Sequence, residues 1–478
     1  MRSGLFHALA GSALCAACGG RGVVESAPST VDIPAGWSQP SEGSELPVGD
    51  YWTRFGDPLL TDFVEQAIVR NRDLAVAASR VAQARAGVRQ ARAGYLPSVF
   101  GNAGVRRDVG DFADDDFAFS LGADVQWQID LFGRIRYDVA ASRANLLAAG
   151  YGLGDVQRLI VGQVAQTTVS ARALAVQLAI ARQTLSVQDD NFQIAEWRNE
   201  AGLVSSLDVE QARAQRAQTA ATIPALERDL AASANTISTL IGEPPGRVLS
   251  LLTENAADIP APPEEVGYDV PIAVIRRRPD VQQAEAFLAA DTAQIGLARA
   301  QLLPLLQVTG NINTASLGLG GLFDTITGNL FAGLSQLIFD GGRLAAQVDV
   351  AEAIAAGSFA TYERTILQSL EDVESAAAAL RGARERVVLF AEARDAADVA
   401  AILARSQYQA GLVDFQALLT AENQLLNSRN AYAASEAERA NAFVRLTQAL
   451  GGGWDPETVE FAIDPPEIIL TGSERTAQ

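Results

Sequence analysis

The chain has 478 residues and a formal net charge of −20 at pH 7, and none of its 37 basic residues is a lysine. Such an acidic chain does not suit the phosphate backbone of a nucleic acid, so we expect no nucleic-acid partner. Its one histidine is His7, which a secretory signal would remove. A Ser-His-Asp triad, a Schiff-base lysine and a histidine-liganded metal are then excluded. We expect no enzyme, cofactor or metal.

The first 17 residues have the pattern of a secretory signal peptide: a basic residue, a short apolar stretch and then small residues. Cys18 follows where a bacterial lipoprotein is cleaved and acylated, although Cys15 replaces the leucine expected three positions earlier. Ordinary signal cleavage is the alternative. We expect a lipid on Cys18 and an extended tether over residues 18–50, because that segment is rich in Pro, Ser and Gly.

The first structural half is expected over residues 51–248. A helix from about residue 59 to 93 leads to a strand at about 98–106. A second strand is expected over 117–131, because apolar residues there alternate with small or polar ones. The apolar set is Phe117, Phe119, Leu121, Ala123, Val125, Trp127, Ile129 and Leu131. Gly133 and Arg134 then end the alternation, and the proline-free stretch 134–199 predicts a helix of roughly 100 Å.

The second half, residues 271–454, repeats the first after a proline-rich connector over 249–270. Asp280 lies 207 residues after Asp73, and Gly342-Arg343 lies 209 residues after Gly133-Arg134. Strands are expected at about 305–314 and 330–340, and a second long helix over 343–408. A flexible tail is expected over 455–478.

Glycines mark both junctions between a strand and a long helix. They are Gly133 before Arg134 and Gly341-Gly342 before Arg343. Neither can be a phosphate-binding loop of the P-loop type, because the chain has no lysine to complete one. We interpret these residues as the points where a strand ends and a helix begins.

Beyond the signal no apolar run is long enough for a transmembrane helix, so any passage through a membrane must use strands. Four strands cannot close a barrel, and open sheet edges are not tolerated in lipid. Three copies would supply twelve strands, an even number within the usual range. The predicted fold class is therefore a homotrimer in which a 12-stranded membrane β-barrel continues into a long α-helical coiled-coil barrel, from chains with an internal two-fold repeat.

Motifs spread over residues 50–454 carry a family resemblance. They are WQIDLFGR, AGLVSSLDVEQA, LIGEPP, RRPDVQQAE, FDGGR and ALGGGW. The chain resembles the TolC-like outer-membrane factors, in the NodT-type lipoprotein branch that serves resistance–nodulation–division (RND) efflux pumps. The resemblance implies a passive exit duct in the outer membrane of a Gram-negative bacterium. Its implied partners are a periplasmic adaptor (membrane fusion) protein, an inner-membrane RND transporter and outer-membrane lipid.

The resemblance also implies a functional end to the helical part. Gly202 and Gly411, in the two AGLV turns, would lie at the periplasmic tips, where the tube closes and the adaptor docks. A turn between helices needs glycine in any case, so a purely structural role is the alternative. Tyr408 matches a family tyrosine that helps to hold the closed tip, and a packing aromatic is its alternative.

Acidic residues near the turns are candidates for a gate. Under threefold symmetry Asp208, Glu210 and Asp414 would each form a ring that favours cations. Acids at a solvated helix start are the alternative. Thr420 stands where the family often has an aspartate, so one expected ring is absent.

Two further alternatives remain open. The RRPD sequence at Arg277–Asp280 is either an anion site or an ordinary helix start. The whole chain is alternatively a periplasmic coiled-coil structural protein, which would have no use for the amphipathic strands.

Overall fold

The structure is a computed structural model that describes residues 29–38, 49–107, 109, 117–254, 258–264, 266–267 and 269–457. The expected signal peptide, Cys18 and residues 458–478 of the expected tail lie outside these ranges. The chain forms two compact units. Among the described residues, the sheet unit includes Ala86–Asn145 and Glu285–Tyr362, and the helical unit includes Val31–Arg85, Leu146–Ala284 and the chain from Glu363 onward.

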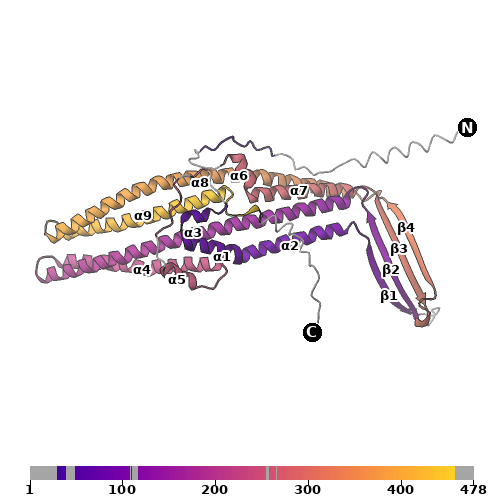
Figure 1. The fold of residues 1–478 in the computed structure, drawn as a ribbon, viewed down its shortest axis with the longest axis horizontal. Coiled ribbons are helices and arrows are strands. Elements are labelled where there is room, and N and C mark those ends of the chain that lie inside the picture. The colour runs from indigo at the N-terminus through magenta and orange to yellow at the C-terminus, as the bar shows by residue number, and fades with distance from the viewer. Residues whose placement is uncertain are drawn as a thin grey trace, which may run out of the picture. The chain divides into compact units, whose positions relative to one another are not determined.

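Helices and strands alternate in two similar series along the chain (Figure 1). The first series is η2 (Tyr51–Phe55), α1 (Pro58–Arg70), α2 (Arg72–Ala93), β1 (Ser98–Arg107), β2 (Phe117–Ile129), α3 (Arg134–Glu200), α4 (Ser206–Leu240) and α5 (Arg247–Glu254). The second is α6 (Pro271–Arg277), α7 (Pro279–Ala300), β3 (Leu305–Ser316), η3 (Leu319–Gly321), β4 (Ile326–Ser335), α8 (Arg343–Gln409) and α9 (Phe415–Ala449).

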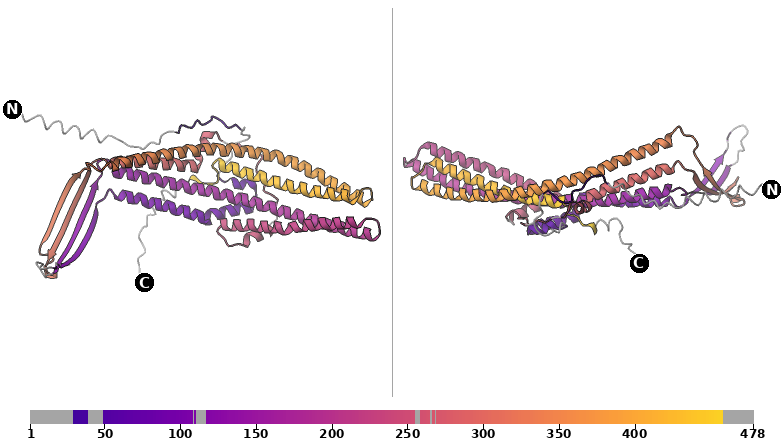
Figure 2. Two further views of the ribbon diagram at one scale, coloured as in Figure 1. Left: turned by 180° about the vertical axis from the view of Figure 1, so that it is seen from behind. Right: turned by 90° about the horizontal axis from the view of Figure 1, so that it is seen from above.

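The four strands form one antiparallel sheet in the order β1-β2-β3-β4, as two views agree (Figures 1 and 2). Its register places Val125 beside Val99 and Gly310, and Gly310 beside Leu330. Residues opposite one another share a face, so this row belongs to an apolar face. The next row, with Asp124 between Phe100 and Asn311, belongs to a more polar face.

Two predicted strands are wrong in their bounds. β2 ends at Ile129 instead of residue 131, because Ile129 is the last residue paired with β3 and the Leu131 amide turns back to the Ile129 carbonyl at 3.0 Å. β4 covers Ile326–Ser335 instead of 330–340. Its pairing ends with Leu305 opposite Ser335, so the apolar residues after Ser335 have no strand beside them in the part of the chain that the structure describes.

The helical unit has a large core built mainly from Ala, Val, Leu and Ile side chains. α3 with α4, and α8 with α9, form two antiparallel hairpins (Figure 2). A buried ion pair ties this core together, with Arg172 Nε 3.0 Å from Asp57 Oδ2. The same carboxylate caps α1 by accepting the Leu59 amide at 2.9 Å, so it has partners on both sides.

The helix expected over residues 59–93 is two helices. Asn71 adopts an extended conformation between α1 and α2. Its side-chain oxygen accepts the amides of Asp73 and Leu74 at 2.8 and 3.1 Å, and its Nδ2 donates to the Leu240 carbonyl at 2.8 Å. One side chain thus caps the start of α2 and the end of α4, and it breaks the longer helix.

The segments expected to be irregular contain ordered contacts. The first residues of the expected connector belong to α5, which buries Val248 and Leu252. Within the expected tether, Trp37 Nε1 donates to the Asp269 carbonyl at 2.7 Å, and the Ser38 amide donates to Glu374 at 2.7 Å.

Among the described residues, α3 is the one helix long and apolar enough to pass a hydropathy test for a membrane span. The mean hydropathy of its most apolar 18 residues is 1.2, and 56% of that window is buried inside the protein. This helix has Val161, Val164, Ala165 and Val169 fully buried in the core of the helical unit. Its apolar stretch is therefore accounted for by packing.

Candidate functional site

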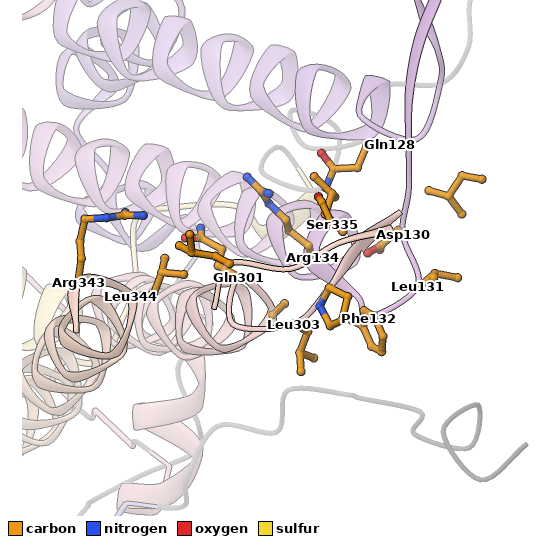
Figure 3. A pocket seen from close by; sticks show the side chains of 15 residues that line it. Gln128, Asp130, Leu131, Phe132, Arg134, Gln301, Leu303, Ser335, Arg343 and Leu344 are labelled. Atoms are coloured by element: carbon orange, nitrogen blue, oxygen red, sulfur yellow. The ribbon is translucent and has the colours of Figure 1, made fainter. Parts of the chain in front are cut away.

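The two strand-to-helix junctions of the sheet unit share one pocket of about 300 Å³. The N-terminal residues of the two long helices, Arg134 and Arg343, both line it (Figure 3). Gln301, which directly follows α7, lies between them in this view. The pocket therefore brings together, within one unit, the two arginines that the sequence analysis singled out.

Glycine and aspartate shape both junctions. Gly133, Gly341 and Gly342 have φ values of +83°, +69° and +88°, in the left-handed region that favours glycine. Asp130 Oδ2 accepts the Arg136 amide at 2.9 Å, and Asp340 accepts the amides of Gly342 and Leu344 at 2.9 Å each. The Leu344 amide, followed by that of Gly342, holds the pKa of Asp340 below its usual range. The helix starts are thus capped locally.

The two AGLV turns have the same backbone geometry. Gly202 and Gly411 both have φ of +73°, and a Cβ at either position would meet open space. The Gly202 amide donates to the Asn199 carbonyl at 2.8 Å, and the Gly411 amide donates to the Tyr408 carbonyl at 3.0 Å. Backbone conformation, and not packing, is what requires glycine in these turns.

The acidic residues beside the turns have local partners. Asp208 and Ser205 form a capping box, in which the Ser205 amide donates to Asp208 at 3.1 Å. Asp414 caps α9 by accepting the Ala417 amide at 2.9 Å. Both carboxylates therefore stabilise helix starts, as expected from the alternative that they are ordinary acids at the start of a helix. A role for these two residues at a gate stays a prediction.

Glu210 and Thr420 lie on exposed helix surfaces. Glu210 is paired with Arg213 at 2.9 Å, and both side chains are more than half exposed. Thr420 donates its hydroxyl to the Gln416 carbonyl one turn earlier, at 2.8 Å. An exposed pair of this kind contributes little to stability.

Tyr408 is a core residue of a small cluster next to the turns. The cluster comprises Ala195, Val209, Ala212, Tyr408, Phe415, Leu418 and Leu419, from α3, α4, α8 and α9. The rings of Tyr408 and Phe415 lie 5.5 Å apart. The Arg198 guanidinium lies 4.7 Å from the Tyr408 ring centroid and donates to the Tyr408 carbonyl at 3.2 Å. Tyr408 thus joins the two helical hairpins.

We expect Tyr408→Phe to leave the thermal unfolding midpoint unchanged or raise it, because the buried Tyr408 hydroxyl has no hydrogen-bond partner among the described residues. Tyr408→Ala should cost about 3–5 kcal/mol of unfolding free energy, since it removes the ring from this cluster. Thermal unfolding of the purified variants in detergent measures both. Equal destabilisation by the two variants would mean that the hydroxyl finds a partner in the assembled protein.

Sequence reasoning missed a buried polar contact near the same turns. Glu422 is 6% exposed, and both its carboxylate oxygens accept from Asn191 Nδ2 at 2.8 Å. Arg405 Nη2 lies 3.2 Å from Glu422 Oε1. A signal was present, because Glu422 lies four residues after the apolar Leu418, on the side of α9 that faces the other helices.

The RRPD sequence holds the end of α9. Arg278, 3% exposed, donates to the Ala449 carbonyl at 3.1 Å and to Asp280 and Asp372 at 2.6 and 2.9 Å. Burial alone would raise the pKa of Asp280, but the hydrogen bond and charge of Arg278 hold it below its usual range. Arg277 donates to the Leu450 carbonyl at 3.0 Å. The guanidinium groups are therefore occupied by protein groups, which argues against the anion-site alternative.

In the part of the chain that the structure describes, no group of three or more His, Cys, Asp or Glu side chains is placed to hold a metal ion. The arrangement offers capped turns, a buried cluster that joins two hairpins, and a sheet with one apolar and one polar face.

Comparison with known proteins gives consistent matches over most of the chain. The profile of the family described as "Outer membrane efflux protein" matches residues 63–243 and 271–452. Nodulation protein T of Rhizobium leguminosarum bv. trifolii is 30% identical over 440 residues, which cover 90% of this chain and 94% of that protein. The pyoverdine export outer membrane protein OpmQ of Pseudomonas aeruginosa is 30% identical over 465 residues, covering 93% and 97%. The solved outer-membrane channel OprN aligns with a TM-score of 0.80 and 29% identity, covering 90% of this chain and all of that one.

Proposed function

Since the chain belongs to the outer membrane efflux protein family, we propose that three copies of it form the exit duct of a tripartite efflux system. The chain is an outer-membrane protein that serves efflux. The finer proposal concerns how the duct is built, what it contacts and how it is anchored.

The observation that carries the trimer is the pair of free sheet edges. The sheet order β1-β2-β3-β4 leaves one side of β1 and one side of β4 without a neighbouring strand among the described residues. Unpaired backbone groups cost several kcal/mol each in lipid, so a membrane sheet must close on itself. β4 of one copy would pair with β1 of the next, and three copies would close a twelve-stranded barrel.

Exposed apolar side chains on α8 support the same assembly. Val388, Leu389, Val399, Ile402 and Leu403 are each 54–68% exposed. A long helix with such residues facing outward needs a partner to cover them. The hairpins α3–α4 and α8–α9 of three copies would cover them within a helical cylinder. A periplasmic filament, the structural alternative, would need no sheet with one apolar face.

An internal repeat would explain the similar halves. α3 and α8 have 67 residues each, α4 and α9 have 35 each, and α2 and α7 have 22 each. Asn71 donates to the Leu240 carbonyl at the end of α4, and Arg278 donates to the Ala449 carbonyl at the end of α9. Both halves thus have a side-chain hydrogen bond to the end of the corresponding helix, made by different residues, and this supports duplication of one unit.

The turns at Gly202 and Gly411 are the proposed docking points for the periplasmic adaptor. Leu203 and Leu412, next to these glycines, are 70% and 75% exposed, which suits a surface that contacts another protein. The adaptor would connect the duct to an inner-membrane RND transporter. The duct itself would be passive, with no catalytic residues, cofactor or nucleic-acid partner, and a lipid on Cys18 would add an anchor to the outer membrane.

Native mass spectrometry of protein extracted with detergent from the outer-membrane fraction tests this proposal. We expect a trimer with one lipid mass increment per chain. Cys18→Ser is the matched control, and it should lose the lipid increment but still form trimers, because the barrel holds the membrane. A water-soluble monomer or dimer without lipid would overturn the duct.

A further inference from the structure

The polar face of the sheet carries one acidic side chain at mid-height. Across the four strands the charged residues are Asp124 in β2 and Arg106 and Arg107 at the far end of β1. Arg107 shares the apolar face and lies over the Phe117 ring. Arg106 shares the polar face, but lies roughly 13 Å along β1 from Asn102. Asp124 is thus the one carboxylate on this surface.

Two amide side chains converge next to Asp124. The register places Gly122 between Asn102 and Asn313, so the three residues share the polar face. A Cβ on Gly122 would lie 2.7 Å from Asn102 Oδ1 and would also collide with Asn313 Oδ1. The two carbonyl oxygens therefore point at the same space above Gly122. Glycine leaves that space open, whereas any other residue would fill it.

Asp124 and Asn311 extend this set of oxygens by one row. Asn102 Nδ2 donates to Asp124 Oδ2, so the amide group of Asn102 turns its oxygen toward Asn313. Asn311 is paired with Asp124 in the register. Its Oδ1 is buried and has no hydrogen-bond partner within the described residues. One carboxylate and three asparagine side chains thus lie on two adjacent rows of the polar face, where their oxygens are available to a common ligand.

We propose that Asp124, Asn102, Asn311 and Asn313 form a cation station on the inner wall of the barrel. The inference rests on the proposed duct, in which the polar face lines the lumen. Carboxylate and amide oxygens are the ligands of hard cations, and the same groups accept hydrogen bonds from protonated amines. One carboxylate per chain makes the binding weak and exchangeable, as a conducting path requires. Three copies place three carboxylates around the lumen, and such a ring favours cations.

This station differs from the acidic residues near the AGLV turns. Asp208 and Asp414 have their carboxylates engaged by helix-start amides, whereas Asn311 Oδ1, next to Asp124 in the register, has no donor among the described residues. The station therefore makes cation preference a property of the membrane sheet as well as of any gate at the turns.

Reversal potentials in planar bilayers under a KCl gradient test the station. We expect the wild-type trimer to prefer K⁺ over Cl⁻, and Asp124→Asn to lower the permeability ratio about threefold, because it removes three charges that face the ions across water. Asn313→Asp should raise the ratio, a gain that misfolding cannot produce. Asp62→Asn, on α1 of the helical unit, is the matched control for net charge and should leave the ratio unchanged.

The outcomes separate this inference from the duct itself. An unchanged ratio in both Asp124→Asn and Asn313→Asp channels that conduct normally would overturn the cation station and leave the duct standing. A wild-type protein that forms no trimer in the outer-membrane fraction would instead count against the proposed duct.

Discussion

Leu330→Arg is expected to abolish assembly in the outer membrane. Leu330 is 80% exposed in the middle of β4, and it shares the apolar face with Gly310 and Val125. Its side chain lies over Gly310, where an added Cβ would come 3.2 Å from Leu330 Cδ1. An arginine facing lipid near the middle of a barrel costs about 2–4 kcal/mol. A trimer would bear that cost three times, in addition to any loss of β4 pairing with the next copy.

Asn329→Arg is the matched control for this substitution. Asn329 is the neighbouring residue in β4 and is paired with Asn311 on the polar face. An arginine there would extend into the water-filled lumen, so trimers should form at close to the wild-type level. The fraction of SDS-resistant trimer in the outer-membrane fraction measures both variants. Normal trimers from Leu330→Arg, or loss of trimers from Asn329→Arg, would reverse our assignment of the two faces.

The strands were predictable because successive side chains of a strand point to opposite faces, so a sheet with one apolar face requires apolar residues at every second position. The alternation from Phe117 onward gave β2 and its two faces, and the same pattern gave β3. The end of β4 was not predictable from its own residues. The apolar run continues to Phe339, which is 86% exposed. The strand nevertheless stops where β3 begins at Leu305, just after Pro304, because a strand needs a partner as well as a pattern.

Near the turns, too, features that depend on local sequence were predictable, whereas a contact between distant residues was not. Gly202 and Gly411 were predictable, because a helix-to-helix turn requires a left-handed residue within a few positions. The contact between Asn191 and Glu422 joins residues 231 positions apart. Nothing near Glu422 indicates that an asparagine of α3 would face it. The spacing from Leu418 places Glu422 on the packed side of α9, but only the packing of the helices identifies the residue that it contacts.

The helix break at Asn71 also depends on a contact with a residue far away in the sequence. An asparagine within a helical pattern is a weak signal, since its side chain competes with the backbone for hydrogen bonds in many settings. Here it ends α1 because its amide group also reaches the last turn of α4. The corresponding residue of the second half is Arg278, whose role the sequence analysis left open between an anion site and a helix start.

Arg278→Met is expected to lower the unfolding free energy by about 3–5 kcal/mol, because it leaves Asp280 partly buried without its partner and frees the end of α9. Arg276→Met is the matched control, since Arg276 is exposed on α6, the short helix that ends just before Arg278. Thermal unfolding in detergent measures both, and similar midpoints would contradict this role.

The pH dependence of unfolding gives a second test of the same contact. Arg278 lowers the pKa of Asp280 in the folded state, so the pair stabilises the fold above the ordinary carboxyl pKa. That stabilisation is lost as the pH falls through the lowered pKa. Wild-type protein should therefore lose stability on acidification more steeply than Arg278→Met, in which Asp280 no longer has a lowered pKa. Parallel pH profiles of the two proteins would mean that Asp280 does not depend on Arg278, and that the guanidinium serves the end of α9 alone.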